Sequence, residues 1–328
     1  MRCALTGANG FLGSHLVDRL LAEGHEVSAL VRESADLRWL QGKELRLVKG
    51  ALDDPAALAQ AFEGAELIFH LAGVVVANDA TAYYRINQEA SRVVAEAAMG
   101  PGEGLRRFVL VSTLAVHGAR PDETGPVSEE SACRPVNHYG RSKLGGEEAA
   151  RALCPGLPLT IIRPGGIYGP RDTASLALFQ QGAKGIYLKM GFGRRMVNMC
   201  HVADIVDGIM LAATRDEGLG ETFLLGDAEN YTLEKLGQTM VRAVRGGKGF
   251  PVWLPLSGAY AVGALGSAVG KLRGKRPPLD LDQVRMYSIR NWAMDVGKAR
   301  RMLGYRPRYT LLEGATETAA WFREQGWL

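Results

Sequence analysis

The feature that most constrains the fold is a glycine-punctuated segment at residues 6–13, TGANGFLG, close to the N-terminus. The apolar run before it, residues 2–6, predicts a buried strand, and apolar residues within 11–22 recur at helical spacing. A strand, a turn and a helix therefore follow one another directly. This order predicts the first unit of an α/β fold with a parallel sheet.

The glycines of this turn fit a phosphate-binding role. Gly7 permits a tight turn, Gly10 lets the backbone approach a pyrophosphate, and Gly13 allows close packing of the helix. The N–H groups at the helix start, including those of Phe11 and Leu12, would hold the phosphates. The first gap differs by one residue from the usual dinucleotide fingerprint, so a glycine-rich turn without a ligand stays open as the alternative for this motif alone.

Tyr139 and Lys143 are four residues apart in a predicted helix, which places them on one face. A tyrosine hydroxyl with its ordinary pKa is a poor base at neutral pH. We expect the Lys143 ammonium to stabilise the phenolate and lower the pKa of Tyr139. Such pairs also arise by chance on helix surfaces, so the context of this pair carries the argument.

That context is a predicted strand at residues 107–111 that delivers Ser112 and Thr113 at its carboxyl end. Active sites of open parallel sheets lie at that edge. Thr113 is therefore placed to hydrogen-bond a reacting oxygen while Tyr139 exchanges a proton with it. The order of glycine turn, Thr113 and the Tyr139/Lys143 pair predicts a nicotinamide-dependent enzyme of hydroxyl and carbonyl chemistry.

With these motifs in place, the chain resembles the extended short-chain dehydrogenases/reductases. This superfamily includes nucleotide-sugar epimerases, dihydroflavonol reductases and 3β-hydroxysteroid dehydrogenases. The resemblance covers nearly the whole chain. Further matching stretches are residues 69–73 (FHLAG), Asn87, 139–143 (YGRSK), 163–170 (RPGGIYGP), 201–204 (HVAD) and 298–307 (KARRMLGYRP).

The resemblance implies roles for particular residues of this chain. It implies that Thr113, Tyr139 and Lys143 are catalytic, with Ser112 as an assistant. It also implies a set of positions that contact the cofactor: Gly7, Gly10, Phe11, Leu12, Gly13, Arg32, Ala72 and Lys143. A dimer built on the helix after Asn87 and the Tyr139 helix would be usual for the superfamily.

The expected architecture is a Rossmann-type, doubly wound parallel sheet with a smaller, interleaved C-terminal lobe for substrate. The length of 328 residues exceeds one ordinary core. We expect the dinucleotide-binding domain to comprise residues 1–165 plus about 198–226, and the substrate lobe about 166–197 and 227–328. Seven strands are predicted at residues 2–6, 26–31, 45–49, 67–71, 107–111, 159–163 and 222–225.

The end of the second strand bears on the choice of cofactor. NAD-preferring relatives place an acidic residue there, whereas this chain has Val31 followed by Arg32. A guanidinium without a neighbouring carboxylate favours the 2′-phosphate of NADP(H), while NAD(H) stays open. The alternative is that Arg32 stacks on adenine or points to solvent. Ala51 replaces an aspartate that contacts adenine in many relatives, which leaves adenine recognition there open.

Two positions bear on the substrate. Nucleotide-sugar enzymes hold a pyrophosphate with an asparagine and an arginine at the positions of Gly166 and Val197 in this chain. Without that donor and that charge, a dianionic pyrophosphate is poorly held, unless Arg194 or Arg195 substitutes. We therefore expect a secondary alcohol or ketone on a bulky hydrophobic substrate. A nucleotide-sugar epimerase or dehydratase with tightly bound NAD is the first alternative, and a non-catalytic dinucleotide-binding protein the second.

Residues 249–270 contain no charged residue, and this uncharged stretch supports a hydrophobic substrate. It reaches the length of a membrane span, but its many glycines and serines make it weakly hydrophobic. An ordinary buried helix, a lid or interfacial helix beside a hydrophobic substrate, and a true membrane span as the least favoured reading are all open. Residues 251–272 could make a peripheral membrane contact. The Lys/Arg-Pro-Pro run at residues 275–278 follows a similar stretch in related sterol and flavonol enzymes. His117, Gly166, Tyr168 and Met196 are the candidate pocket residues. For His117 a loop position without a catalytic role is the favoured alternative, and for Tyr168 and Met196 core packing is equally open.

Charge and cysteine content bear on which binding partners are expected. The net charge of +4 is dispersed, with no basic tract of the kind nucleic-acid binders carry, so nucleic acid is not an expected partner. The four cysteines lack paired metal-ligand spacing, and we expect reduced thiols and no metal. The chain starts directly on a strand, which predicts no signal peptide and a cytoplasmic protein, with membrane association left open by the uncharged stretch.

Overall fold

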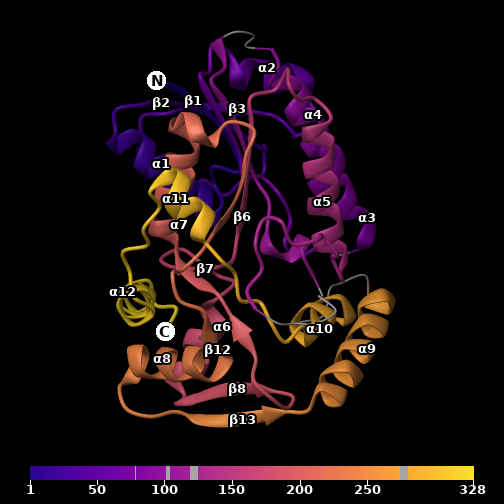
Figure 1. Cartoon of the computed structure of the whole chain (residues 1–328), viewed down its shortest axis with the longest axis vertical. Helices are drawn as coiled ribbons and strands as arrows, with labels where there is room; N and C mark the ends of the chain where they lie inside the picture. The colour runs from indigo at the N-terminus through magenta and orange to yellow at the C-terminus, as the bar shows by residue number, and fades with distance from the viewer. Residues whose placement is uncertain (78, 101–103, 119–124, 274–279) are drawn as a thin grey trace.

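A seven-stranded sheet forms the centre of the larger half of the molecule (Figure 1). The computed structural model describes residues 1–77, 79–100, 104–118, 125–273 and 280–328. The run at residues 275–278 lies outside them. The strands are β1 (Arg2–Thr6), β2 (Glu26–Val31), β3 (Arg46–Lys49), β4 (Leu67–His70), β5 (Arg107–Val111), β6 (Leu159–Pro164) and β11 (Thr222–Leu225). All seven predicted strands are confirmed, with ends that differ by at most one residue.

The strand order is β11-β6-β5-β4-β1-β2-β3, and every pairing in this sheet is parallel. The chain therefore runs outward from β1 to β3 and then crosses back to β4 on the other side of β1. Ligands of open α/β sheets bind at such a reversal, outside the carboxyl ends of the strands. The glycine turn after β1 lies at this reversal.

Helices cover both faces of the sheet. One face packs against α1 (Phe11–Ala22), α7 (Val202–Thr214) and α11 (Gly297–Leu303), and the other against α2 (Pro55–Phe62), α4 (Ala90–Ala97) and α5 (His138–Arg151). Successive strand residues alternate between the two cores, as Ala4 and Leu5 do. The doubly wound α/β prediction is confirmed. Two short segments, α3 (Ala80–Tyr84) and the π-helical η1 (Arg85–Glu89), lead into α4.

The smaller half is built from segments far apart in sequence. It contains α6 (Leu176–Ala183), β8 (Ile186–Met190), β9 (Met196–Val197), β12 (Tyr231–Thr232), α8 (Leu233–Arg245), β13 (Phe250–Leu254), α9 (Leu256–Arg273), α10 (Leu281–Ser288) and α12 (Leu311–Glu324). β8 pairs with β13 in parallel and β9 with β12 in antiparallel. A pair of short strands, β7 (Gly166–Tyr168) and β10 (Met199–His201), connects the two halves.

One C-terminal segment lies apart from the expected substrate lobe. Ala299 and Leu303 of α11 and the following Tyr305 belong to the same buried cluster as β1, α1 and α7. The Tyr305 hydroxyl donates a hydrogen bond of 2.9 Å to the carbonyl of Gly226, just after β11. The chain thus returns to the Rossmann half before α12 packs on α8.

The uncharged stretch forms β13 and most of α9. Within the described residues, no helix combines the length and the apolar character that crossing a bilayer requires. α9 packs on α10 through its smallest residues: Ala259 is buried, and a methyl group added to Gly263 would come within 2.8 Å of Val284. Figure 1 shows α9 at the edge of the molecule, beside α10.

Candidate active site

The carboxyl end of β5 and the first turns of α5 bring Thr113, Tyr139 and Lys143 together. Asn137 starts α5 because its side chain accepts a hydrogen bond of 2.9 Å from the N–H of Gly140. This cap places Tyr139 in the first turn of the helix. Thr113 starts the short helix η3 (Leu114–Val116), and its hydroxyl oxygen accepts a 3.2 Å hydrogen bond from the N–H of Ala115.

The electrostatics of Tyr139 differ from the sequence-based expectation. Burial raises the pKa of the phenol above its usual value, and a hydrogen bond with Thr113 acts in the opposite direction. The net shift of the Tyr139 pKa is therefore upward, opposite to the lowering expected from Lys143. A half-buried, protonated phenol beside Thr113 is a proton donor rather than a ready base.

Lys143 is almost fully buried and its ammonium faces the sheet. Its Nζ donates a hydrogen bond of 2.6 Å to the carbonyl of Val111 in β5. Burial lowers the pKa of Lys143 to about 8, and the carboxylate of Glu147 one turn further along α5 opposes this. The ammonium also lies near the loop after β4, because a methyl group added to Gly73 would be 3.7 Å from Nζ.

Asn87 holds this loop against α5. Its side-chain oxygen accepts a 2.8 Å bond from the N–H of Val74, and its amide donates to the carbonyl of Val74 and the hydroxyl of Ser142. Asn87 lies within η1, a π-helical turn of the sort that often occurs at functional sites. The match of Asn87 to the family pattern marks this residue in the sequence, whereas its contacts with Val74 and Ser142 are known only from the structure.

Ser112 is turned away from Thr113 and Tyr139. It is buried and donates to Glu147, which also accepts two hydrogen bonds from Arg163. The second partner of Arg163 is the Nε2 atom of His117. His117 has no exposed surface and is not among the residues that line the cavity beside Thr113 and Tyr139. The structure thus contradicts a place for it in that cavity and agrees with the alternative of a histidine outside the reaction. Its ring packs into the polar network behind the site.

The glycine turn has the shape that a pyrophosphate needs. Gly7 has a positive φ of 78°, and a methyl group on it would lie 2.6 Å from the N–H nitrogen of Ala72. A methyl group on Gly13 would lie 2.1 Å from the carbonyl oxygen of Gly7. Gly10 is exposed where α1 begins, and no side chain caps that end. The first N–H groups of α1, those of Phe11 and Leu12 among them, thus face outward for an anion.

Arg32 follows β2 directly, on the same edge of the sheet as the glycine turn. Its side chain is exposed and forms no hydrogen bond or ion pair within the described part of the chain. Arg38, a little further along, is already paired with Asp36 at 2.6 Å. Arg32 is therefore a free guanidinium at the position where a cofactor ribose would lie.

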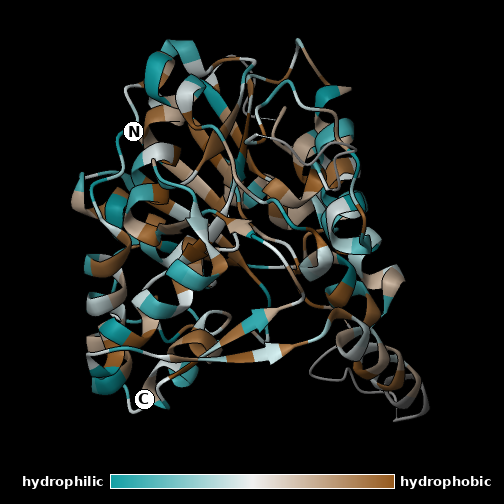
Figure 2. Cartoon of the chain, turned by 60° about the horizontal axis from the view of Figure 1, so that its bottom comes forward, coloured by the Kyte–Doolittle hydropathy of each residue, from teal (hydrophilic) through white to brown (hydrophobic). Residues whose placement is uncertain are grey.

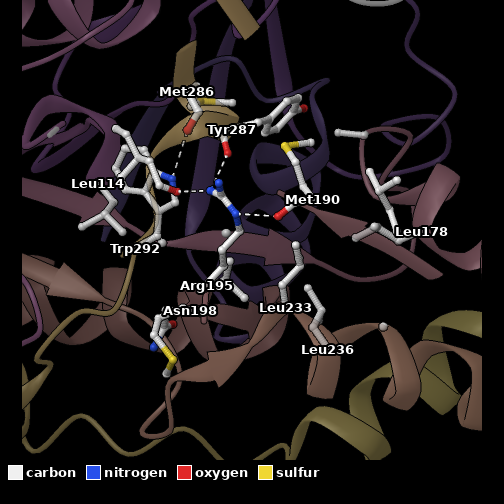
Figure 3. A pocket seen from close by; sticks show the side chains of 18 of the residues that line it. Leu114, Leu178, Met190, Arg195, Asn198, Leu233, Leu236, Met286, Tyr287 and Trp292 are labelled. Carbon is white, nitrogen blue, oxygen red and sulfur yellow. Dashed lines mark hydrogen bonds between the residues drawn. The ribbon is translucent and has the colours of Figure 1, made fainter. Parts of the chain in front are cut away.

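A cavity of about 510 Å³ opens beside Thr113 and Tyr139. Most of its lining is apolar, and Figure 3 shows several of these side chains pointing into it. The apolar side chains are Leu114, Leu178, Leu188, Met190, Met196, Val197, Leu233, Leu236, Met240, Met286, Ile289 and Trp292. Gly166 and Met196, two of the candidate pocket residues, line it.

Tyr168 does not line this cavity; of the two readings open for it, core packing is the one the structure has. It is 1% exposed in the core of the smaller half, its hydroxyl donates to the carbonyl of Leu311, and its ring packs edge-on against His201. A methyl group at Gly314 would come within 2.5 Å of the Tyr168 hydroxyl. The side chain is thus held by α12, far along the chain.

Arg195 lines the cavity, but its charge is already satisfied. Its Nε donates 2.7 Å to the carbonyl of Met190, and its Nη1 lies 3.2 Å from each of the carbonyls of Tyr287, Ser288 and Ile289 (Figure 3). The guanidinium therefore closes the C-terminal end of α10. Arg194 is exposed and lines a separate hollow. Neither arginine is arranged to hold a pyrophosphate in the apolar cavity.

Comparisons with known proteins agree with this geometry. The sequence model of the NAD dependent epimerase/dehydratase family matches residues 3–226. The chain belongs to this family. It is 33% identical to a ceramide reductase of Caulobacter vibrioides, over 99% of this chain and 95% of that protein. It is 30% identical to a 4-hydroxy-2-methyl-3-oxo-4-farnesyl-3,4-dihydroquinoline-1-oxide ketoreductase of Stigmatella aurantiaca, over 96% and 94%.

Solved structures show the same fold. A dTDP-glucose 4,6-dehydratase from Streptomyces venezuelae, with NAD bound, superposes with a TM-score of 0.80 at 26% identity and covers 100% of this chain and 98% of that one. The family binds a nicotinamide dinucleotide. The glycine cradle and the exposed start of α1 fit such a group. The extended short-chain dehydrogenase/reductase resemblance, and the enzyme class it implies, are confirmed.

Proposed function

We propose that this protein is an NADP(H)-dependent oxidoreductase that interconverts a secondary alcohol and a ketone on a bulky hydrophobic substrate. The observation that carries the proposal is the apolar cavity that opens on Thr113 and Tyr139. Among the described residues that line it, the one strongly cationic group is Arg195, which donates to four backbone carbonyls. The similarity to reductases of a ceramide and of a farnesylated quinoline oxide supports the same substrate class.

Thr113, Tyr139 and Lys143 have distinct roles in the proposed reaction. A bound nicotinamide dinucleotide would supply or accept the hydride. Thr113 orients the reacting oxygen by hydrogen bonding, and Tyr139 gives its phenolic proton to that oxygen during reduction. The raised pKa of Tyr139 suits this direction, because the phenol stays protonated until the oxygen becomes strongly basic. Lys143 lies below, where its ammonium can hold a ribose hydroxyl near Gly73.

The apolar walls bind the substrate by excluding water. Leu178 of α6, Leu236 of α8 and Met286 of α10 come from different helices, so a long or polycyclic substrate contacts several elements at once. Methionine side chains such as Met190 and Met196 adapt to irregular apolar shapes. Arg32 supplies the preference for the 2′-phosphate of NADP(H).

The test is oxidation of NADPH, with NADH in parallel, by the purified protein on a panel of long-chain ketones, sterol ketones and sugar nucleotides. We expect ketone-dependent oxidation with a preference for NADPH. Tyr139→Phe should keep dinucleotide binding and lose turnover by about a hundredfold or more. Retained turnover in this variant would remove Tyr139 from the reaction.

The nucleotide-sugar alternative predicts different results in the same experiment. The structural similarity to the sugar-nucleotide dehydratase keeps it under test. It requires NAD that copurifies with the protein, tight binding of a UDP- or dTDP-sugar, and no net consumption of NADPH. Those three results together would replace the hydrophobic ketone as the proposed substrate.

A further inference from the structure

Along its described side chains, which end at Ala268, α9 lacks the charges that an exposed helix face normally carries. From Leu256 to Ala268 the sequence contains no charged residue. Val262 and Leu265 are 55% and 68% exposed, while the inner face of the helix, with Ala259 and Gly263, packs on α10. Amphipathic surface helices place polar residues outward. This helix presents aliphatic side chains there instead, and Figure 2 shows it in white to brown along its described part.

The same character continues onto β13 and the turn after β8. The indole N–H of Trp253 donates to the carbonyl of Gly191 at 3.0 Å, and the Trp253 ring lies 4.8 Å from that of Phe192. Side chains on both faces of β13 are exposed. We define the apolar rim as six residues that are 46% to 76% exposed: Phe192, Phe250, Val252, Trp253, Val262 and Leu265.

The apolar rim borders the wall of the cavity. β13 pairs along its length with β8, whose Leu188 and Met190 line the cavity. On the α9 side, the Tyr260 hydroxyl donates to Ser288 at 3.2 Å, next to the cavity-lining Tyr287, which is 45% exposed. Whatever covers the rim therefore lies beside the cavity.

Basic side chains accompany the rim. Arg194 follows Phe192 closely, and Arg285 and Arg290 flank Tyr287. All three arginines are exposed, and none has an ion-pair partner within the part of the chain that the structure describes. The acidic groups of α10 are engaged in helix caps: Asp280 accepts from the N–H of Gln283 and Asp282 from that of His138. Exposed apolar side chains beside unpaired arginines are complementary to an anionic lipid surface.

We propose that the apolar rim docks peripherally on an anionic lipid bilayer, with Val262, Leu265 and Trp253 inserted among the lipids and the three arginines at the headgroups. This surface is additional to the proposed catalytic activity and does not depend on the identity of the substrate. It would place the cavity wall at the membrane surface.

The test is cosedimentation of the full chain with vesicles of phosphatidylcholine alone and of phosphatidylcholine mixed with phosphatidylglycerol. We expect binding to the anionic vesicles that weakens as salt is added. Leu265→Asp and Val262→Asp should each reduce the partition coefficient about tenfold or more. Arg285→Glu and Arg290→Glu should each reduce it about fivefold or more on anionic vesicles.

The matched control is Leu219→Asp, because Leu219 is 55% exposed, as Val262 is, but lies between α7 and β11 in the Rossmann half. The control should bind vesicles like the wild type. Thermal unfolding of each variant shows that the fold is kept. Failure of the wild type to bind anionic vesicles at low salt would overturn the proposal. Equal loss in Leu219→Asp would also overturn it. So would a dimer in sedimentation velocity that Leu265→Asp abolishes, since the rim would then face a second copy.

Discussion

Glu147 and Arg163 form a two-pronged ion pair in the interior, with N···O distances of 2.9 and 2.6 Å. Both side chains are almost fully buried. The pair joins α5 to β6 one helical turn beyond Lys143, and so fixes the helix that carries Tyr139 relative to the sheet. Its role is therefore open to a direct test.

Glu147→Gln should destabilise the protein by about 3 to 5 kcal/mol, because it keeps the side-chain shape but leaves the buried Arg163 charge without its partner. Urea unfolding of wild type and variant measures this. The neighbouring Glu148 is exposed, so Glu148→Gln should change the free energy of unfolding by less than about 0.5 kcal/mol. An equal decrease in the free energy of unfolding in both variants would show that the buried ion pair does not stabilise the fold more than an exposed glutamate does.

Lys143→Met should stabilise the protein at neutral pH by about 1 to 3 kcal/mol and abolish turnover. Burial lowers the pKa of Lys143 to about 8 from an ordinary value of 10.5, so the folded state holds the charged amine at a cost below about pH 8. Between these pH values the unfolded chain binds more protons, and wild-type stability rises with pH through this window. The difference between wild type and variant should shrink there. A difference that stays constant from pH 7 to pH 10 would contradict the lowered pKa.

Gly13→Ala should weaken dinucleotide binding by about tenfold and destabilise the fold by about 1 to 3 kcal/mol. The added methyl group would meet the carbonyl oxygen of Gly7 at 2.1 Å, so the phosphate turn must shift. Calorimetric titration with NADPH and thermal unfolding measure the two effects. Gly104→Ala is the control, because a methyl group there has nothing within 4 Å. Unchanged binding in Gly13→Ala would place the cofactor elsewhere.

Arg32→Ser should raise the KM for NADPH about tenfold to a hundredfold and leave the KM for NADH nearly unchanged, because only NADPH carries the 2′-phosphate. The measurement is steady-state kinetics with both cofactors at two salt concentrations. Arg38→Ser removes a neighbouring arginine that already pairs with Asp36, and should affect both cofactors little. An equal rise for both cofactors would assign Arg32 to adenine rather than to the phosphate.

Local patterns in the sequence were enough for the sheet and the glycine turn. The strand predicted at residues 2–6 and the close approach of Gly13 to Gly7 depend on neighbours within a few positions, and the structure has them as expected. Tyr168 could not be placed this way. Its hydroxyl bonds to Leu311, 143 residues away, so its burial depends on a helix that the local pattern does not mention.

The pairing of charges at the site and the pKa of its tyrosine could not be predicted from the sequence either. The sequence alone allows Arg195 as a phosphate ligand. Its guanidinium is instead bound by backbone carbonyls 92 to 94 residues further along the chain, which local spacing does not predict. The spacing of Tyr139 and Lys143 was right for one helix face. The raised pKa of Tyr139, however, comes from the surrounding burial, which residue spacing does not encode.

The parallel pair of β8 and β13 should open on a different timescale from the central sheet. β13 is exposed on both faces and pairs only with β8 among the described strands, whereas β4 and β5 are buried throughout and pair on both sides. The amides of β13 should therefore exchange with deuterium long before those of β5. Thr113 follows β5 and Tyr139 lies on α5, which packs on the sheet, so we expect the proposed reacting residues to belong to the slowly exchanging part. The wall formed by β8 and β13 should then open and re-form without unfolding that part. We therefore expect entry of a large substrate to depend on opening of the β8–β13 wall. Alignment of the reacting groups depends on the central sheet and α5, which need not open with that wall.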